Sequence, residues 1–238
     1  MRSIIQGKEP AALRGWKRDN RTTTQNLSYK NIPGPVLILI KQALRMEQKG
    51  LCAYTLQRLT DIQALHLEHI EPQNQQPEKS IDYSNMAVCF PSDGGDTSHD
   101  YGAPMKGGQA VQLNEDFVSP HSKGCEKRFI FTSDGKISSV QNDQAAKQTI
   151  RTLHLDCSIL NELRQRALAA NGLTINSRNL RVKQIRLTAT EASRLAKYVI
   201  EPNSKGLLDP FCTAIAQVAK AYAQSEKKRS QRKRKVKR

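Results

Sequence analysis

The sequence His66-Leu67-Glu68-His69-Ile70-Glu71-Pro72 concentrates more reactive side chains than any other stretch of the chain. Two of the five histidines lie within four residues, with a glutamate between them. Imidazole is a metal ligand and a base near neutral pH, and a carboxylate binds hard divalent cations. Apolar and polar residues alternate where the chain enters this stretch, which predicts a short strand that ends at Pro72.

Strand geometry places neighbouring side chains on opposite faces, so Glu68 and His69 are expected to diverge within the strand. Both can still approach one ion if the strand ends or bulges here, because the alternation then fails. The alternative is structural: a solvated glutamate beside two histidines that only make hydrogen bonds. The stretch by itself leaves both interpretations open.

Further short motifs occur in a fixed order on both sides of this stretch. They are Leu51-Cys52-Ala53-Tyr54-Thr55, the Asn-containing segment 80–89, the lysine-bearing turn 101–107, Ser119-Pro120, Cys125-Glu126, Phe129-Ile130-Phe131 and Asp134-Gly135. The ordered set resembles the HNH (ββα-metal) nucleases. It is most similar to the HNH subunit of Septu-type and retron-linked anti-phage defence systems, over residues 1–170 well and over the remainder loosely.

The resemblance implies roles for individual residues. Glu68 would be a ligand of Mg²⁺ or Mn²⁺, and His69 the general base that activates water. Asn85 would tie the loop to the strand and orient the His69 imidazole, because a base works only when one ring nitrogen is held. Lys106 would contact phosphate. The structural alternatives are an Asx-turn for Asn85 and a surface lysine for Lys106.

The third metal ligand is where the sequence departs from the HNH pattern. HNH nucleases usually place a His or Asn a few residues before this lysine, but here that region offers Ala103 and Pro104, which cannot bind a metal. The nearest side chains that can are His99 and, behind it, Asp100. His66 shares a strand face with Glu68 and is predicted to contact phosphate or to support the site, with a purely structural hydrogen bond as the alternative.

A second departure concerns structural zinc. Many HNH proteins carry a Cys-x-x-Cys pair on either side of the catalytic stretch, whereas here Cys52 is followed by Thr55 and Cys89 has no cysteine nearby. A four-cysteine zinc site built from two such pairs is therefore excluded. A reduced site built from Cys52, Cys89 and His99 stays open, and so does the alternative that both cysteines pack as small apolar residues.

The charge of the chain points to a polyanionic partner. The 238 residues carry a formal net charge of +16, and nine of the last thirteen residues are Lys or Arg. The connector 173–187 adds further cations, which include Arg178, Arg181 and Lys183. Nucleic acid is the first expectation, because each phosphate that is neutralised releases counterions. A solvated, disordered run is the alternative for the tail.

The cysteines and the apolar pattern suggest a compartment. The chain has five cysteines, an odd number, and none lies close to another in sequence. We find neither a secretory signal nor a run of eighteen apolar residues. Free thiols in a reducing cytoplasm are therefore expected.

The predicted fold is α+β and mostly helical, with a ββα-metal (HNH) nuclease core between helical regions. We assign 1–50 to a basic arm and helix, 51–142 to the nuclease core, 143–226 to a C-terminal helical region, and 227–238 to a basic disordered tail. The core is predicted to hold a strand pair within 51–72, a helix or turn at 82–90 and a hairpin within 109–140. Helices are predicted at 36–49, 143–153, 156–171, 188–199 and 210–224, with Asp143 and Asp156 as the N-caps of the second and third.

Two functions from different classes fit these features. The first is a metal-dependent HNH endonuclease that cuts DNA or RNA. Resemblance implies that it acts with an ABC-type ATPase subunit and, in some systems, with a retron reverse transcriptase and its msDNA. The second is a non-catalytic nucleic-acid-binding adaptor that retains the HNH fold. A basic structural protein of ribosomal type explains the charge but not Glu68-His69-Ile70 with Asn85.

Overall fold

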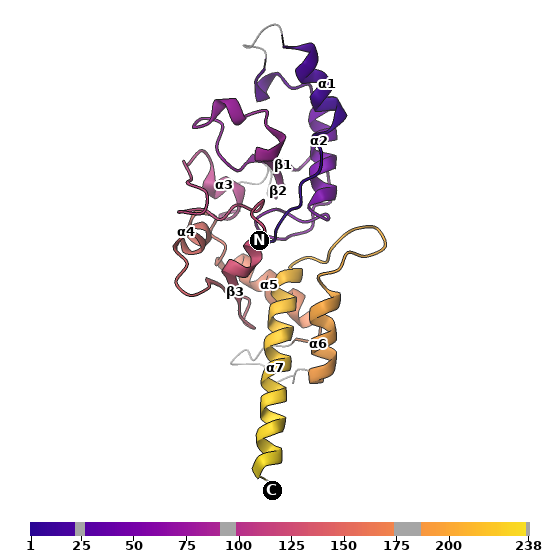
Figure 1. Ribbon diagram of the computed structural model, residues 1–238, viewed down its shortest axis with the longest axis vertical. Coiled ribbons are helices and arrows are strands. Elements are labelled where there is room, and N and C mark those ends of the chain that lie inside the picture. Colours follow the sequence, from indigo (N-terminus) through magenta and orange to yellow (C-terminus); the bar gives the residue numbers. More distant parts are fainter. Residues whose placement is uncertain (22–26, 91–98, 174–186, 237–238) are drawn as a thin grey trace.

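The computed structural model describes residues 1–21, 27–90, 99–173 and 187–236, with side chains up to 232. Over these ranges the chain is an α+β protein in which helices predominate and two separate two-stranded antiparallel sheets lie between them. The molecule is elongated: the first two helices lie at one end and the last helix extends from the other (Figure 1). The predicted α+β class is therefore confirmed.

The N-terminal arm is packed into the protein. Met1 and Ile4 are buried, and the amide of Ile4 donates to the carbonyl of Pro120 at 2.8 Å. Helix α1 (Ala11–Asp19) follows the arm, and helix α2 (Gly34–Glu47) begins where the sequence supplies a proline for its first turn. The helix predicted at 36–49 is confirmed, two residues earlier at each end.

The first sheet pairs β1 (His66–His69) with β2 (Met86–Cys89), in the register His66 to Cys89 and His69 to Met86. The short strand predicted to end at Pro72 is confirmed over His66–His69, but its predicted partner is wrong. Residues 51–54 form only an isolated bridge from Leu51 to Arg58, and the segment predicted as helix or turn at 82–90 supplies the second strand. Because β2 is buried on both faces, it reads as a continuous apolar run that lacks the period of two.

The second sheet is the predicted hairpin, with β3 (Phe129–Phe131) paired to β4 (Ile137–Ser139). Its turn needs a glycine at position 135 for two reasons. Gly135 has φ +78°, which disfavours L side chains, and a Cβ there would lie 2.2 Å from the carbonyl oxygen of Asn161. The hairpin therefore sits directly against the helix that contains Asn161.

Three of the four C-terminal helices match their predicted bounds within two residues: α4 (Gln144–Thr152), α5 (Ser158–Ala170) and α6 (Ala189–Tyr198). Asp143 caps α4 as predicted, since its carboxylate accepts from the amide of Ala146 at 3.0 Å. The cap predicted for Asp156 is wrong.

Asp156 lies one residue too early to cap α5, whose N-cap is Cys157. Its carboxylate accepts instead from the amide of Ile137 in β4, at 3.1 Å. Asp156 was predicted as a helix cap, but it links the start of α5 to the hairpin.

Helix α7 (Cys212–Val236) is the longest element and continues well beyond the predicted end at 224. Its first half packs beside α6 and β3, where Gln217 accepts from the amide of Phe131 at 3.1 Å and donates to the carbonyl of Phe129 at 3.0 Å. Ala223 is the last buried residue in the part of α7 with described side chains, and residues 227–232 are all exposed. The tail predicted to be disordered from 227 is helical through Val236 (Figure 1).

None of the helices in the described ranges combines the length and the apolar character that crossing a bilayer requires.

Gly135→Ala is expected to lower the free energy of unfolding by about 2–4 kcal/mol, because the methyl group meets backbone at a positive φ. Gly15→Ala is the matched control: it lies inside α1 with no atom within 4 Å of the added Cβ, and it should raise stability by about 0.5–1 kcal/mol. Urea unfolding of both variants measures the difference. Equal stability of the two variants would contradict this account of the hairpin.

Candidate functional site

The candidate site lies on β1 and is held from behind by α2. Gln48, just after α2, accepts from the amide of Val88 and donates to the carbonyls of Leu51 and Val88, all at 2.8 Å. This side chain fixes β2, and β2 in turn fixes β1. The strand therefore carries Glu68 and His69, which are 4% and 7% exposed, on a rigid support.

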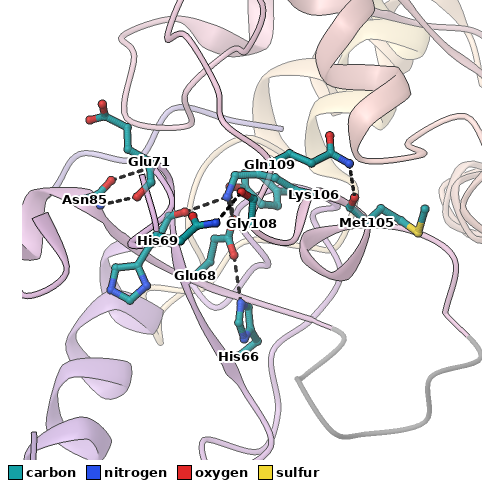
Figure 2. A network of polar contacts seen from close by, with 11 residues as sticks. His66, Glu68, His69, Glu71, Asn85, Met105, Lys106, Gly108 and Gln109 are labelled. Carbon is teal, nitrogen blue, oxygen red and sulfur yellow. Dashed lines mark hydrogen bonds and ion pairs between the residues drawn. The ribbon is translucent and has the colours of Figure 1, made fainter. Parts of the chain in front are cut away.

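Glu68 is a buried carboxylate on which three donors converge, and two of them, Lys106 and His66, are labelled in Figure 2. Oε1 accepts from Lys106 Nζ at 2.6 Å and from the Tyr54 hydroxyl at 2.8 Å. Oε2 accepts from His66 Nε2 at 3.0 Å. The donors come from the 51–55 segment, from β1 and from the end of the short helix α3 (Ala103–Lys106).

Opposing effects set the charge state of Glu68. Burial on its own raises the pKa of the carboxyl, but the hydrogen bond from His66 and the positive charge of Lys106 outweigh it, so the pKa lies below its usual value. Burial and the Glu68 charge raise the pKa of Tyr54 well above its usual value. The pair is therefore an ionised carboxylate and a protonated phenol that donates to it.

His69 is a neutral imidazole held at one nitrogen. Its Nε2 lies 2.8 Å from the carbonyl oxygen of Ser80, and Tyr29 packs edge-on against the ring at 4.9 Å between centroids. A carbonyl only accepts, so Nε2 carries the proton and Nδ1 carries the lone pair of the neutral ring. Burial lowers the pKa of His69 below its usual value, which favours this neutral, basic form near pH 7.

Asn85 ties the loop to the strand end. Its amide oxygen accepts from the Glu71 amide at 2.8 Å, and its nitrogen donates to the carbonyls of Glu71 at 2.9 Å and Lys79 at 3.3 Å. The carbonyl that holds the His69 ring belongs to Ser80, the residue after Lys79. Asn85 therefore holds the backbone next to the carbonyl that contacts the His69 ring.

The predicted metal ligands do not gather around Glu68. The His99 ring lies 5.6 Å from Phe90 and 5.4 Å from Tyr101 between centroids, and Asp100 is exposed. Within the described residues, no hydrogen bond or ion pair joins His99 or Asp100 to Glu68. No group of three or more His, Cys, Asp or Glu side chains suited to a metal ion occurs in that part of the chain either.

As folded, these residues do not fit a divalent cation at Glu68. Both carboxylate oxygens already have donors, and the nearest is the Lys106 ammonium. A divalent ion bound to the same carboxylate would lie beside that positive charge in a buried site, where repulsion is strong.

The cationic residues predicted to bind nucleic acid differ in their placement. Lys106 is 1% exposed, and it also donates to the His69 carbonyl at 2.9 Å. His66 is half-buried and donates to Glu68. Arg178, Arg181 and Lys183 lie outside the described residues.

Cys52 and Cys89 are free thiols with no exposed surface. Cys52 Sγ accepts from the amide of Phe90 at 3.4 Å and lies 3.6 Å from its carbonyl oxygen. Among the described side chains no third zinc ligand joins them.

Two residues of this site were missed by reasoning from the sequence. Tyr54 was noted only as part of a motif, and Ser80 only as the start of one. Their roles depend on a hydroxyl and a backbone carbonyl that reach residues 14 and 11 positions away. No local pattern in the sequence distinguishes such a tyrosine from any other core tyrosine.

No protein-family model matches this chain, and no curated protein is similar enough to it to count as a relative.

Glu68→Gln should lower the free energy of unfolding by about 3–5 kcal/mol at pH 7, because it leaves the buried Lys106 without its counter-charge. Glu162→Gln is the control: the Glu162–Arg166 pair is exposed, and its loss should cost less than about 0.5 kcal/mol. The pKa of Glu68 is lowered on folding, so its contribution is present above the unfolded pKa and disappears as the pH falls through the folded pKa. Denaturant unfolding of both variants against pH measures this; a Glu68→Gln cost that does not shrink in acid would contradict the assignment.

Proposed function

We propose that this protein hydrolyses phosphodiester bonds of nucleic acid and that His69 is its general base. The observation that carries the proposal is the neutral imidazole of His69, held at Nε2 by Ser80, one residue from a buried charge cluster. Attack at phosphorus needs a base that is unprotonated near neutral pH and fixed in direction. His69 meets both requirements.

The order of elements supports an HNH-like core. Two antiparallel strands, β1 and β2, are followed in sequence by the short helix α3, whose last residue reaches back to Glu68. This strand–strand–helix order is the one that the ββα name describes. In this proposal the core resembles that of an HNH nuclease, with a lysine where the resemblance would put a metal.

In the proposed reaction, His69 is the base and Lys106 supplies positive charge. Nδ1 of His69 takes a proton from water as the oxygen attacks phosphorus. The bond from phosphorus to the leaving oxygen then breaks, and that oxygen takes a proton from solvent. Lys106 supplies positive charge to the same strand end through its bond to the His69 carbonyl.

The charge distribution supports nucleic acid as the substrate. The chain carries +16, and residues 227–232 of α7 expose Lys227, Lys228, Arg229 and Arg232 on a helix clear of the body. Only Glu226 opposes them locally, in an ion pair with Arg229 at 3.6 Å. By the resemblance to Septu-type systems, we extend the proposal to a defence effector that acts with an ABC-type ATPase, and with a retron reverse transcriptase and msDNA where these are present.

One observation favours a second function, a nucleic-acid-binding adaptor that does not cut. Every donor around Glu68 is satisfied within the protein, and the cluster is almost fully buried. Such a site is equally suited to holding the core together while α7 binds the polyanion. Only the first function requires His69, because only a nuclease needs a general base.

His69→Ala is expected to abolish cleavage of plasmid DNA or total RNA while binding is unchanged, since the base is lost and the charge of the chain is kept. The control is His154→Asn at an exposed position with φ +45°, which asparagine tolerates. Each protein is assayed with and without the ATPase partner, in EDTA and with Mg²⁺ or Mn²⁺. Identical products from wild type and His69→Ala under every condition would leave the adaptor as the function.

The rate of cleavage should depend on pH through His69. Because burial lowers the pKa of His69, its basic form persists below pH 6.5. We therefore expect a plateau at neutral pH and a fall as the pH drops through the lowered pKa. Single-turnover cleavage rates from pH 4.5 to 8 give the midpoint of this fall. A midpoint above pH 6.5 would contradict the assignment of His69 as the base.

Replacing Lys227, Lys228 and Arg232 by Gln should weaken nucleic-acid binding and reduce the slope of log K against log salt by about 2–3 if each contacts a phosphate. The matched control replaces three exposed cations of the body, Lys123, Lys136 and Arg166, by Gln. Fluorescence anisotropy across a salt titration gives both slopes. Equal losses in the two triple variants would show that α7 has no particular role.

A further inference from the structure

Lys106 occupies a position that few lysines adopt. It is 1% exposed at the end of a four-residue helix, flanked by Gly102 and Gly107, both with positive φ. These two glycines let the chain turn sharply on each side of the lysine. The Lys106 side chain is directed toward Glu68 and His69 (Figure 2). A buried ammonium persists only where a counter-charge and acceptors are built around it.

Both acceptors of the Lys106 ammonium lie on β1, the strand where the resemblance to HNH nucleases would place the metal ion. Nζ donates to Glu68 Oε1 at 2.6 Å and to the His69 carbonyl at 2.9 Å. One cation thus binds a carboxylate oxygen and a backbone oxygen, which are both ligands that a hard divalent ion prefers.

The rest of the cluster matches an ammonium better than a metal. Tyr54 donates to the same oxygen, Glu68 Oε1, and His66 donates to Oε2. Donors with hydrogens directed at a carboxylate compete with a metal ion, whereas they are compatible with a lysine, which also donates. One carboxylate and one ammonium cancel, so the buried cluster needs no further positive charge.

We propose that the Lys106 ammonium is the resident cation of this site, covalently fixed to the chain, and that Glu68 is its counter-ion and not a ligand of Mg²⁺ or Mn²⁺. The inference goes beyond the proposed hydrolysis, because it concerns which cation occupies the site whether or not the protein cuts. It also changes what hydrolysis would require: cleavage that depends on His69 would persist in EDTA.

Direct binding of Mn²⁺ to the full chain tests the proposal without an activity assay. Free Mn²⁺ is measured by electron paramagnetic resonance at millimolar metal, and thermal unfolding is followed with and without Mn²⁺. Wild type and the exposed control Lys123→Ala are expected to bind no stoichiometric Mn²⁺ and to show no shift in Tm. One Mn²⁺ bound by wild type and lost in Glu68→Gln would overturn the proposal.

Lys106→Ala separates a cation site from a merely structural lysine. Removing the ammonium leaves Glu68 without a counter-charge beside a small cavity, so this variant should gain one Mn²⁺, and the double variant Lys106→Ala/Glu68→Gln should lose it again. Ethylammonium should raise the Tm of Lys106→Ala and leave that of Lys123→Ala unchanged. A Lys106→Ala protein that folds and responds to neither cation would also overturn the proposal.

Lys106→Met is used if Lys106→Ala does not fold. The methionine side chain fills the space of the lysine but carries no charge. This variant should bind no Mn²⁺ and should lose the acid-dependent stability that Glu68 contributes in wild type. An unchanged stability profile against pH would contradict the pairing. A protein that fails every cleavage assay would defeat the proposed hydrolysis but leave these binding results to decide the cation.

Discussion

The buried pair between Lys106 and Glu68 is the constraint on which the centre of this protein depends. Burial penalises each charge alone, so neither side chain can stay where it is without the other. The pair joins α3 to β1 across 38 positions of sequence, and Tyr54 adds the segment before β1 to the same oxygen. The ion pair therefore holds the end of α3 against β1.

The sequence predicted well those features that local chemistry decides. The strand at His66–His69 follows from alternation, the α4 cap from Asp143, and the capping box of α6 sits where a helix start was predicted at Thr188. Each depends on residues three or four positions apart, so a short window contains the whole cause.

Features decided by distant contacts could not be predicted in this way. The partner of β1 is β2, and Gln48, which follows α2, holds β2 from 40 positions away. Lys106 could be predicted as a useful cation but not as a buried one, since its burial depends on where Glu68 lies after folding. The basic end of α7 was predicted to be disordered from composition alone, whereas the buried half of the same helix continues into it.

The two residues at the centre of the candidate site act from opposite faces of one strand. Glu68 faces Lys106, Tyr54 and His66, while His69 faces Ser80 and Tyr29, and its ring points away from Lys106 (Figure 2). The faces communicate through the backbone, because Lys106 holds the carbonyl of His69 itself. A single ammonium thus neutralises the carboxylate and fixes the peptide that carries the imidazole. In such an arrangement the charge cluster orients the base, and the position of the base is as rigid as the ion pair behind it.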